Sequence, residues 1–214
     1  MTDQYADTAS ARFRYARAGT GIPVLLLPGS GGWRLTFHTM AGVLAERHTV
    51  FALGPPGQGL TEVLDPDFGY DADAIARSIA AFLGAVGLER TAIVGHSWGG
   101  GFALRFAELY PERVTRLALL APGGLDVKDT WEFRLLRLPV VGELVVRLPS
   151  TASVGHLLRK SFVRRERVPD DLIGEVVGEL RSGRNRAARL AGRRAGERSW
   201  IHRLRCTGRR PTDA

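Results

Sequence analysis

The stretch Gly95-His96-Ser97-Trp98-Gly99, directly after the apolar run Thr91-Ala92-Ile93-Val94, decides the fold of this chain. A serine between two glycines at the end of a buried strand is typical of a nucleophile elbow, a sharp strand-to-helix turn. The turn holds the serine in a strained backbone conformation and raises its hydroxyl above the sheet edge. Gly95 and Gly99 let the strand and the following helix pass without side-chain collision.

Strands and helices are expected to alternate on both sides of this elbow. Apolar or alternating stretches predict strands over residues 11–16, 23–27, 48–53, 91–94 and 114–120. Stretches with helical periodicity predict helices over residues 33–47, 71–86 and 98–109. The run Pro23-Val24-Leu25-Leu26-Leu27 is continuously apolar, as in a parallel strand buried on both faces. The fold class is therefore α/β, with a doubly wound, mostly parallel sheet.

Two glycine-rich loops follow predicted strands. Pro28-Gly29-Ser30-Gly31-Gly32 comes after the strand at 23–27, and Gly54-Pro55-Pro56-Gly57-Gln58-Gly59 comes after the strand at 48–53. Sites in sheets of this kind form at the carboxyl ends of the strands. Both loops and the elbow are expected at that edge, so the sequence predicts a site there.

The pattern changes near residue 126, which gives three predicted regions. Residues 1–125 form the α/β core, residues 126–195 a helical cap insertion, and residues 196–214 a basic, irregular tail. Helices are expected over 131–148, 152–162 and 170–180, and no further buried strand is expected there. The apolar helix faces would form the roof of a pocket. A peripheral membrane helix over 135–148 is the alternative.

Charge and cysteine content limit the partners. The net charge is +8, but residues 1–180 hold 19 basic and 20 acidic residues, so the excess lies in the last 34 residues. Those residues contain 11 arginines against Glu197 and Asp213. No apolar run is long enough to span a membrane. Cys206 is the only cysteine and no signal peptide is visible, so we expect a cytoplasmic protein without membrane partners.

Taken together, residues 11–195 resemble an α/β-hydrolase: an oxyanion loop, a G-x-G loop, a nucleophile elbow and a helical cap, in that order. The resemblance implies that Ser97 is the nucleophile and that the backbone N–H of Trp98 is one oxyanion donor. It implies the backbone N–H of Ser30 as the second donor, and an ordinary glycine-rich turn is the alternative for Ser30. It implies no metal and no organic cofactor. Gly54 stands where the family has an acid, and His96 is expected to pack rather than to catalyse.

The triad acid and histidine that the resemblance implies are not found. The family places them after later strands, and beyond residue 180 the chain has no run of four apolar residues. Asp126 and Asp129 are expected to begin a helix rather than to act as the acid. The remaining histidines are weak candidates for the base: His38, His48, His156 and His202. We therefore expect a C-terminally truncated hydrolase that lacks its last strands.

Two functions remain open, with a third of another class. The first is a hydrolase that acts on a small, fairly apolar ester or related bond by acyl transfer through Ser97. The second is a catalytically inactive scaffold, because a serine hydroxyl without a base is a poor nucleophile. The third is nucleic-acid binding through the arginine-rich tail, which lacks aromatic interleaving and which we do not expect. Substrate identity and oligomeric state are left open.

Overall fold

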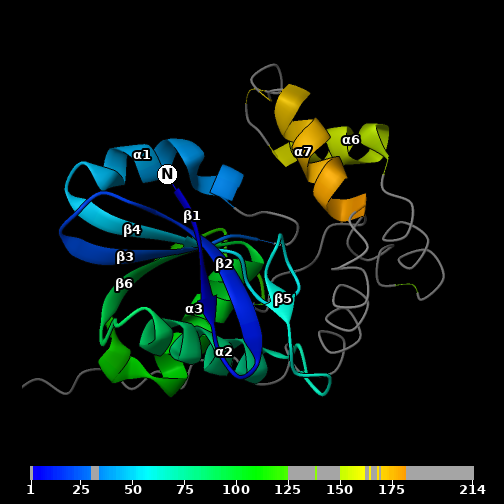
Figure 1. The fold of residues 1–214 in the computed structure, drawn as a ribbon. Coiled ribbons are helices and arrows are strands. Elements are labelled where there is room, and N and C mark those ends of the chain that lie inside the picture. The colour runs from blue at the N-terminus through cyan, green and yellow to red at the C-terminus, as the bar shows by residue number, and fades with distance from the viewer. Residues whose placement is uncertain are drawn as a thin grey trace, which may run out of the picture.

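The computed structural model describes residues 2–29, 34–124, 150–161 and 170–181, together with Leu138, Arg164 and Val168. Its centre is a seven-stranded mixed sheet with strand order β1-β2-β4-β3-β6-β7, and β5 pairs with β2 beside this path (Figure 1). The four strands β3, β4, β6 and β7 run parallel. The predicted α/β class and doubly wound, mostly parallel sheet are confirmed.

The parallel strands lie where continuous apolar runs predict them. They are β3 (Ile22–Leu27), β4 (His48–Leu53), β6 (Thr91–His96) and β7 (Val114–Leu120). The last four residues of β3 and the last five of β4 are buried. Leu25 pairs with Phe51 on one side and with Ile93 on the other, which places β3 in the middle of the sheet. Side chains on both faces of β3, β4 and β6 enter apolar cores, as is typical of parallel sheets, whereas β7 is only partly covered.

The chain begins with a strand that the sequence does not predict. β1 (Thr2–Asp7) pairs antiparallel with β2 (Ala11–Ala18), and β2 then pairs antiparallel with β4. The short β5 (Glu62–Val63) adds a second partner to β2. β1 is polar, and side-chain bonds to β2 help to hold it: Asp3 pairs with Arg14, and Gln4 accepts from the hydroxyl of Tyr15 at 2.7 Å.

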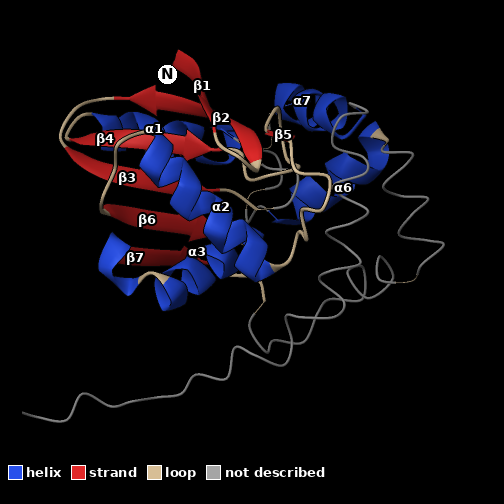
Figure 2. Ribbon diagram, turned by 60° about the horizontal axis from the view of Figure 1, so that its bottom comes forward, coloured by secondary structure: helices blue, strands red, loops and turns tan. Residues whose placement is uncertain are grey.

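Helices cover the two faces of the sheet (Figure 2). α2 (Ala72–Ala85) and α3 (Trp98–Leu109) pack on one face, over a core that includes Phe13, Leu25 and Phe82. η1 (Arg34–Phe37) and α1 (His38–Ala45) pack on the other face, over a smaller core around Leu26. The predicted helix at 33–47 is thus a 3-10 turn followed by an α-helix. A second 3-10 turn, η2 (Pro111–Arg113), leads into β7.

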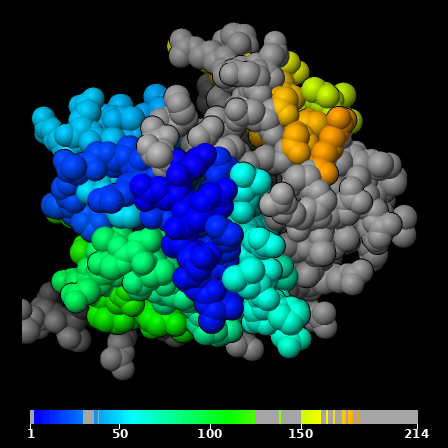
Figure 3. All heavy atoms as spheres, viewed as in Figure 1, coloured from blue at the N-terminus to red at the C-terminus, as the bar shows by residue number. Residues whose placement is uncertain are grey.

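Two further helices lie beyond the sheet. α6 (Thr151–Ser161) and α7 (Asp170–Arg181) pack on each other through a cluster of their own that includes Val154, Ile173 and Val177. Figures 1 and 2 place this pair on the side where the parallel strands end, and the space-filling view shows β1 and β2 on the front of the molecule (Figure 3). No strand follows β7 within the described residues. None of the described helices has the length and apolar character to cross a bilayer.

Candidate active site

Ser97 occupies the turn between β6 and α3 with a left-handed backbone. Its φ is 53° and its ψ is −125°, in a region that residues other than glycine rarely adopt. The Ser97 N–H donates to the carbonyl of Leu120 at 3.0 Å, and the Ser97 carbonyl accepts from the N–H of Gly123 at 2.7 Å and of Gly100 at 2.9 Å. The end of the neighbouring strand and the first turn of α3 therefore hold the strained residue in place.

Glycines allow β6 and α3 to approach this closely. A Cβ atom at Gly95 would lie 2.6 Å from the Cα of Gly100, and one at Gly99 would lie 2.2 Å from the carbonyl oxygen of Leu27. Both distances are far inside van der Waals contact, and the obstructing atoms belong to the backbone. The close packing of strand, helix and the end of β3 depends on the absence of these side chains.

The loop after β3 comes directly up to the serine side chain. A Cβ atom at Gly29 would lie 2.7 Å from the Cβ and 3.2 Å from the Oγ of Ser97. The backbone of Gly29 therefore borders the hydroxyl, which brings the two sequence motifs together at one edge of the sheet. Ser30, the second oxyanion donor in the sequence analysis, lies outside the described residues.

Trp98 is the first residue of α3, so its backbone N–H belongs to the helix N-terminus. N–H groups in the first turn of a helix have no carbonyl partner within the helix. The helix dipole adds partial positive charge at the same end. The site of a Cβ at Gly123 would lie 3.3 Å from the Trp98 nitrogen, which shows how closely the loop after β7 follows this turn. This arrangement favours negative charge beside Ser97.

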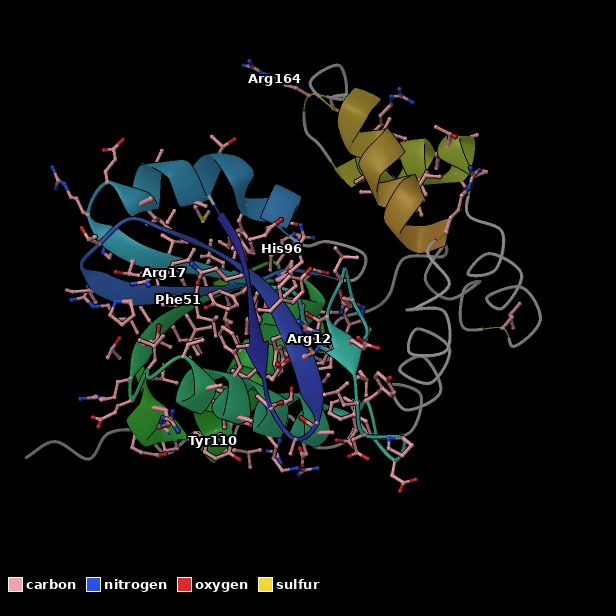
Figure 4. All side chains as sticks on the ribbon, viewed as in Figure 1. Arg12, Arg17, Phe51, His96, Tyr110 and Arg164 are labelled. Carbon is pink, nitrogen blue, oxygen red and sulfur yellow. The ribbon has the colours of Figure 1, made fainter. Side chains whose placement is uncertain are left out.

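His96 is the last residue of β6, directly before Ser97, and a Cβ atom at Gly29 would lie 3.4 Å from its Nδ1. Its ring makes an edge-on contact with Phe37, with 6.5 Å between ring centroids. The buried Nδ1 has no hydrogen-bond partner among the described residues. Burial lowers the pKa of His96 below its ordinary value of 6.5, so the ring is neutral at pH 7. Figure 4 shows His96 at the carboxyl end of the sheet.

The other candidate residues for a triad are not brought to Ser97. The Nδ1 of His48 lies 3.2 Å from the carbonyl of Leu44, at the amino end of β4, and His156 is exposed on α6. The side chain of His38 and all of His202, Asp126, Asp129 and the arginine-rich tail lie outside the described residues. No hydrogen bond joins the Oγ of Ser97 to a described residue.

The G-x-G loop after β4 is tied to the sheet rather than to the serine. The Thr61 hydroxyl donates to the carbonyl of Gly54 at 2.7 Å and accepts from the Arg14 N–H at 3.0 Å. These bonds give the loop a structural role. No cluster of potential metal ligands occurs in the described part of the chain.

Sequence reasoning missed the support that Gly29 and Gly123 give to the elbow. Both glycines follow the ends of strands that flank β6. This shared position in the sequence could have indicated that both lie near the elbow. Their close approach to Ser97 is a consequence of strand order, which places β3 and β7 on either side of β6.

Comparisons with known proteins agree with this geometry. Residues 22–198 match the family model described as alpha/beta hydrolase fold. An uncharacterized protein of Mycobacterium tuberculosis is 33% identical over 167 residues, which cover 75% of this chain and 48% of that protein. A 2-hydroxy-6-oxo-6-phenylhexa-2,4-dienoate hydrolase of Comamonas testosteroni is 34% identical over 125 residues, which cover 56% of this chain and 43% of the relative. The chain spans about half the length of the curated relatives it matches.

Solved structures show the same fold. A meta-cleavage product hydrolase from Pseudomonas fluorescens IP01 superposes with a TM-score of 0.75 at 24% identity, over 90% of this chain and 71% of that chain. The epoxide hydrolase CorEH superposes with a TM-score of 0.78 at 21% identity, over 94% of this chain and 75% of that chain. The match over residues 22–198, the sheet order and the strand-to-helix turn at Ser97 lead to one conclusion: the chain belongs to the α/β-hydrolase fold family.

Proposed function

We propose that this chain carries the nucleophile of a serine hydrolase, which cleaves small, fairly apolar substrates by acyl transfer through Ser97. The observation that supports this most is the backbone of Ser97 at φ 53°, at the end of β6 and beside Gly29. A strained backbone at a strand end persists only where the surrounding structure enforces it, and such residues cluster at active sites. Here four backbone hydrogen bonds enforce it, two with the end of β7 and the loop after it and two with the first turn of α3.

In this proposal the Ser97 Oγ attacks a carbonyl carbon while its proton passes to a base. The resulting oxyanion accepts a hydrogen bond from the Trp98 N–H, with the Ser30 N–H as the second donor. The carbonyl re-forms as the leaving group departs with a proton. Water then hydrolyses the acyl-enzyme and releases a carboxylic acid. One oxyanion donor is typically worth about 10²–10³ in rate.

The relatives narrow the proposed substrate class. The Comamonas enzyme is named for a 2-hydroxy-6-oxo-6-phenylhexa-2,4-dienoate, which contains no ester or amide. A second relative from that organism, 36% identical over 166 residues, is named for a related oxo acid. Hydrolysis of such a compound has to break a carbon–carbon bond next to the ketone. We therefore propose two substrate types for this site, carboxylic esters and carbon chains cleaved beside a ketone.

An inactive scaffold is the second candidate, and one observation favours it. None of the described histidines is hydrogen-bonded to Ser97, and a serine without a base retains only weak catalysis from binding and the oxyanion hole. The two candidates differ in a measurable quantity, which is the hydrolysis rate that depends on the Ser97 hydroxyl.

Turnover assays separate the candidates. The purified chain is given a short-chain p-nitrophenyl ester and, in parallel, 2-hydroxy-6-oxo-6-phenylhexa-2,4-dienoate. The proposal predicts hydrolysis of at least one substrate, and a loss of about 10³-fold or more in Ser97→Ala. The matched control Ser10→Ala, in the turn between β1 and β2, should keep the full rate. Equal rates in Ser97→Ala and the parent would overturn the role of Ser97, and no turnover of either substrate would favour the scaffold.

A further inference from the structure

The ring of His96 lies beside both ends of the segment that joins β3 to α1. His96 is the last residue of β6, at the carboxyl edge of the sheet (Figure 4). A Cβ atom at Gly29, near the start of the segment, would lie 3.4 Å from the Nδ1 of His96. Phe37, the last residue of η1 and directly before α1, meets the same ring edge-on at 6.5 Å between centroids. One side chain therefore borders the chain shortly after it leaves β3 and again where α1 begins.

Gly29 also borders the side chain of Ser97. The same Cβ position would lie 2.7 Å from the Cβ and 3.2 Å from the Oγ of Ser97. A displacement of the Gly29 backbone therefore changes the surroundings of the hydroxyl. Gly29 directly precedes Ser30, the second oxyanion donor of the proposed mechanism. The Gly29 backbone thus connects the His96 ring with the proposed chemistry at Ser97.

His96 places a polar atom beside Gly29 at a cost in stability. Its Nδ1 is buried and has no hydrogen-bond partner among the described residues, so folding removes water from this atom without replacing it. Burial lowers the pKa of His96, which keeps the ring neutral at pH 7. Buried polar atoms without a partner are rare in folded proteins, and a role in function is one reason for which a protein retains them.

We propose that His96 is a positioning residue, whose ring holds Gly29 against the Ser97 side chain and thereby sets the rate of the step at the hydroxyl. This role rests on the proposed function of Ser97, and His96 acts through Gly29 rather than on the substrate. Attack on a carbonyl carbon needs aligned groups, and a displacement of about 1 Å can lower the rate about 10²-fold. A change at His96 should therefore lower kcat and leave KM nearly unchanged.

Substitutions at His96 test this role with the ester and oxo-acid substrates. His96→Ala removes the ring and should lower kcat about 10- to 100-fold, with KM changed less than about threefold. His96→Asn keeps a polar atom at the position of Nδ1, so its kcat should stay within about threefold of the parent value. His48→Ala is the matched control, at a partly buried histidine whose Nδ1 lies 3.2 Å from the carbonyl of Leu44, and it should keep the parent kcat.

Backbone relaxation by ¹⁵N NMR tests the positioning itself and needs no turnover. The order parameter of the Gly29 amide should fall from about 0.85 in the parent to below about 0.6 in His96→Ala. The amide of Gly123, which borders the elbow from the side of β7, should keep its order parameter in the same variant. His96→Asn and His48→Ala should both keep a rigid Gly29, and the spectra report that all variants remain folded.

The two measurements separate the role of His96 from the proposed function. A parent that turns over neither substrate would count against the proposed function, and the Gly29 order parameter would then decide the role of His96. Any of four results would overturn that role: a parent-like kcat in His96→Ala, a change confined to KM, a loss in His96→Asn or His48→Ala as large as in His96→Ala, or a Gly29 amide that stays rigid without the ring.

Discussion

At the scale of single residues, Gly99 is a position where any side chain would collide with the backbone. A Cβ there would meet the carbonyl oxygens of Leu27 and Pro28 at 2.2 and 2.4 Å, and neither backbone can withdraw without disturbing β3. We predict that Gly99→Ala lowers the free energy of unfolding by about 1–3 kcal/mol or more. Urea denaturation measures this change.

Gly84 provides the matched control for this substitution. It also lies in a helix, α2, but its Cβ position has nothing within 4 Å. Gly84→Ala should raise the free energy of unfolding by up to about 1 kcal/mol, because alanine is the better helix former. If Gly99→Ala proved as stable as Gly84→Ala, the close approach of α3 to the end of β3 would be wrong.

His96 should make the stability depend on pH. Burial lowers the pKa of this ring below 6.5, so the folded chain binds fewer protons than the unfolded chain as the pH falls. The free energy of unfolding is therefore predicted to decrease as the pH falls below about 6.5, and to level off below the folded pKa. Urea denaturation of the parent and of His96→Gln across this range measures the slope.

The His96→Gln variant should lose most of that slope, since glutamine does not titrate. His156→Gln, a change at an exposed histidine of α6, should keep the parent slope. A parent slope that survives in His96→Gln would show that another group is responsible.

At the scale of elements, one ion pair joins α2 to α3. Arg105 donates two hydrogen bonds to Asp73, with Nε–Oδ1 at 2.6 Å and Nη2–Oδ2 at 3.2 Å, and this pairing raises the pKa of Arg105. A double-mutant cycle with Arg105→Gln and Asp73→Asn should give a coupling free energy of about 1 kcal/mol, reduced in 1 M salt (about 3 Å Debye length). Arg12 and Asp7 form a more exposed single contact at 3.5 Å. A double-mutant cycle on Arg12 and Asp7 should give a coupling free energy of about 0–0.5 kcal/mol. Equal coupling free energies for the two pairs would contradict the bidentate geometry of Arg105 and Asp73.

The strands show which secondary-structure elements can be predicted from the sequence and which cannot. The apolar runs at 23–27 and 48–53 predicted β3 and β4 because burial on both faces leaves an unbroken signal. β1 went unpredicted because its stability comes from pairing at a sheet edge and from polar side-chain contacts, which leave no hydrophobic pattern. The two-residue β5 is too short to have a pattern of its own.

Of the candidate site, only the strand-to-helix turn at residues 95–99 could be predicted from the sequence. The motif at 95–99 predicted the turn that the structure places at Ser97, since the glycine spacing is a local property of strand and helix. The contacts of Gly29 and Gly123 with Ser97 arise from strand order, which links segments about 70 and 26 residues apart in number and is invisible to local patterns. The contact of the His96 ring with Phe37 likewise joins two different elements, β6 and η1.

At the scale of the whole molecule, α6 and α7 should behave as a unit separate from the sheet. Among the described residues, their apolar cluster shares no member with the two cores of the sheet. Ile173, 3% exposed, lies at its centre. We predict that Ile173→Ala accelerates amide hydrogen exchange in both helices and leaves β3 and β6 unchanged, because the cavity destabilises only the local cluster.

A core substitution provides the contrast for this exchange experiment. Ile79→Ala, at a fully buried position of α2, should accelerate exchange throughout the sheet as well. If Ile173→Ala also accelerated exchange in β6, the helix pair and the sheet would form one cooperative unit, against the prediction.

The role of Ser97 as a nucleophile is the central claim, and covalent labelling tests it most directly. The chain is treated with a fluorophosphonate, digested, and analysed by mass spectrometry. We predict a single phosphonyl adduct on the peptide that contains Ser97, no adduct in Ser97→Ala, and an unchanged adduct in Ser10→Ala. A chain that stays unlabelled, or carries its adduct on another residue, would contradict the claim.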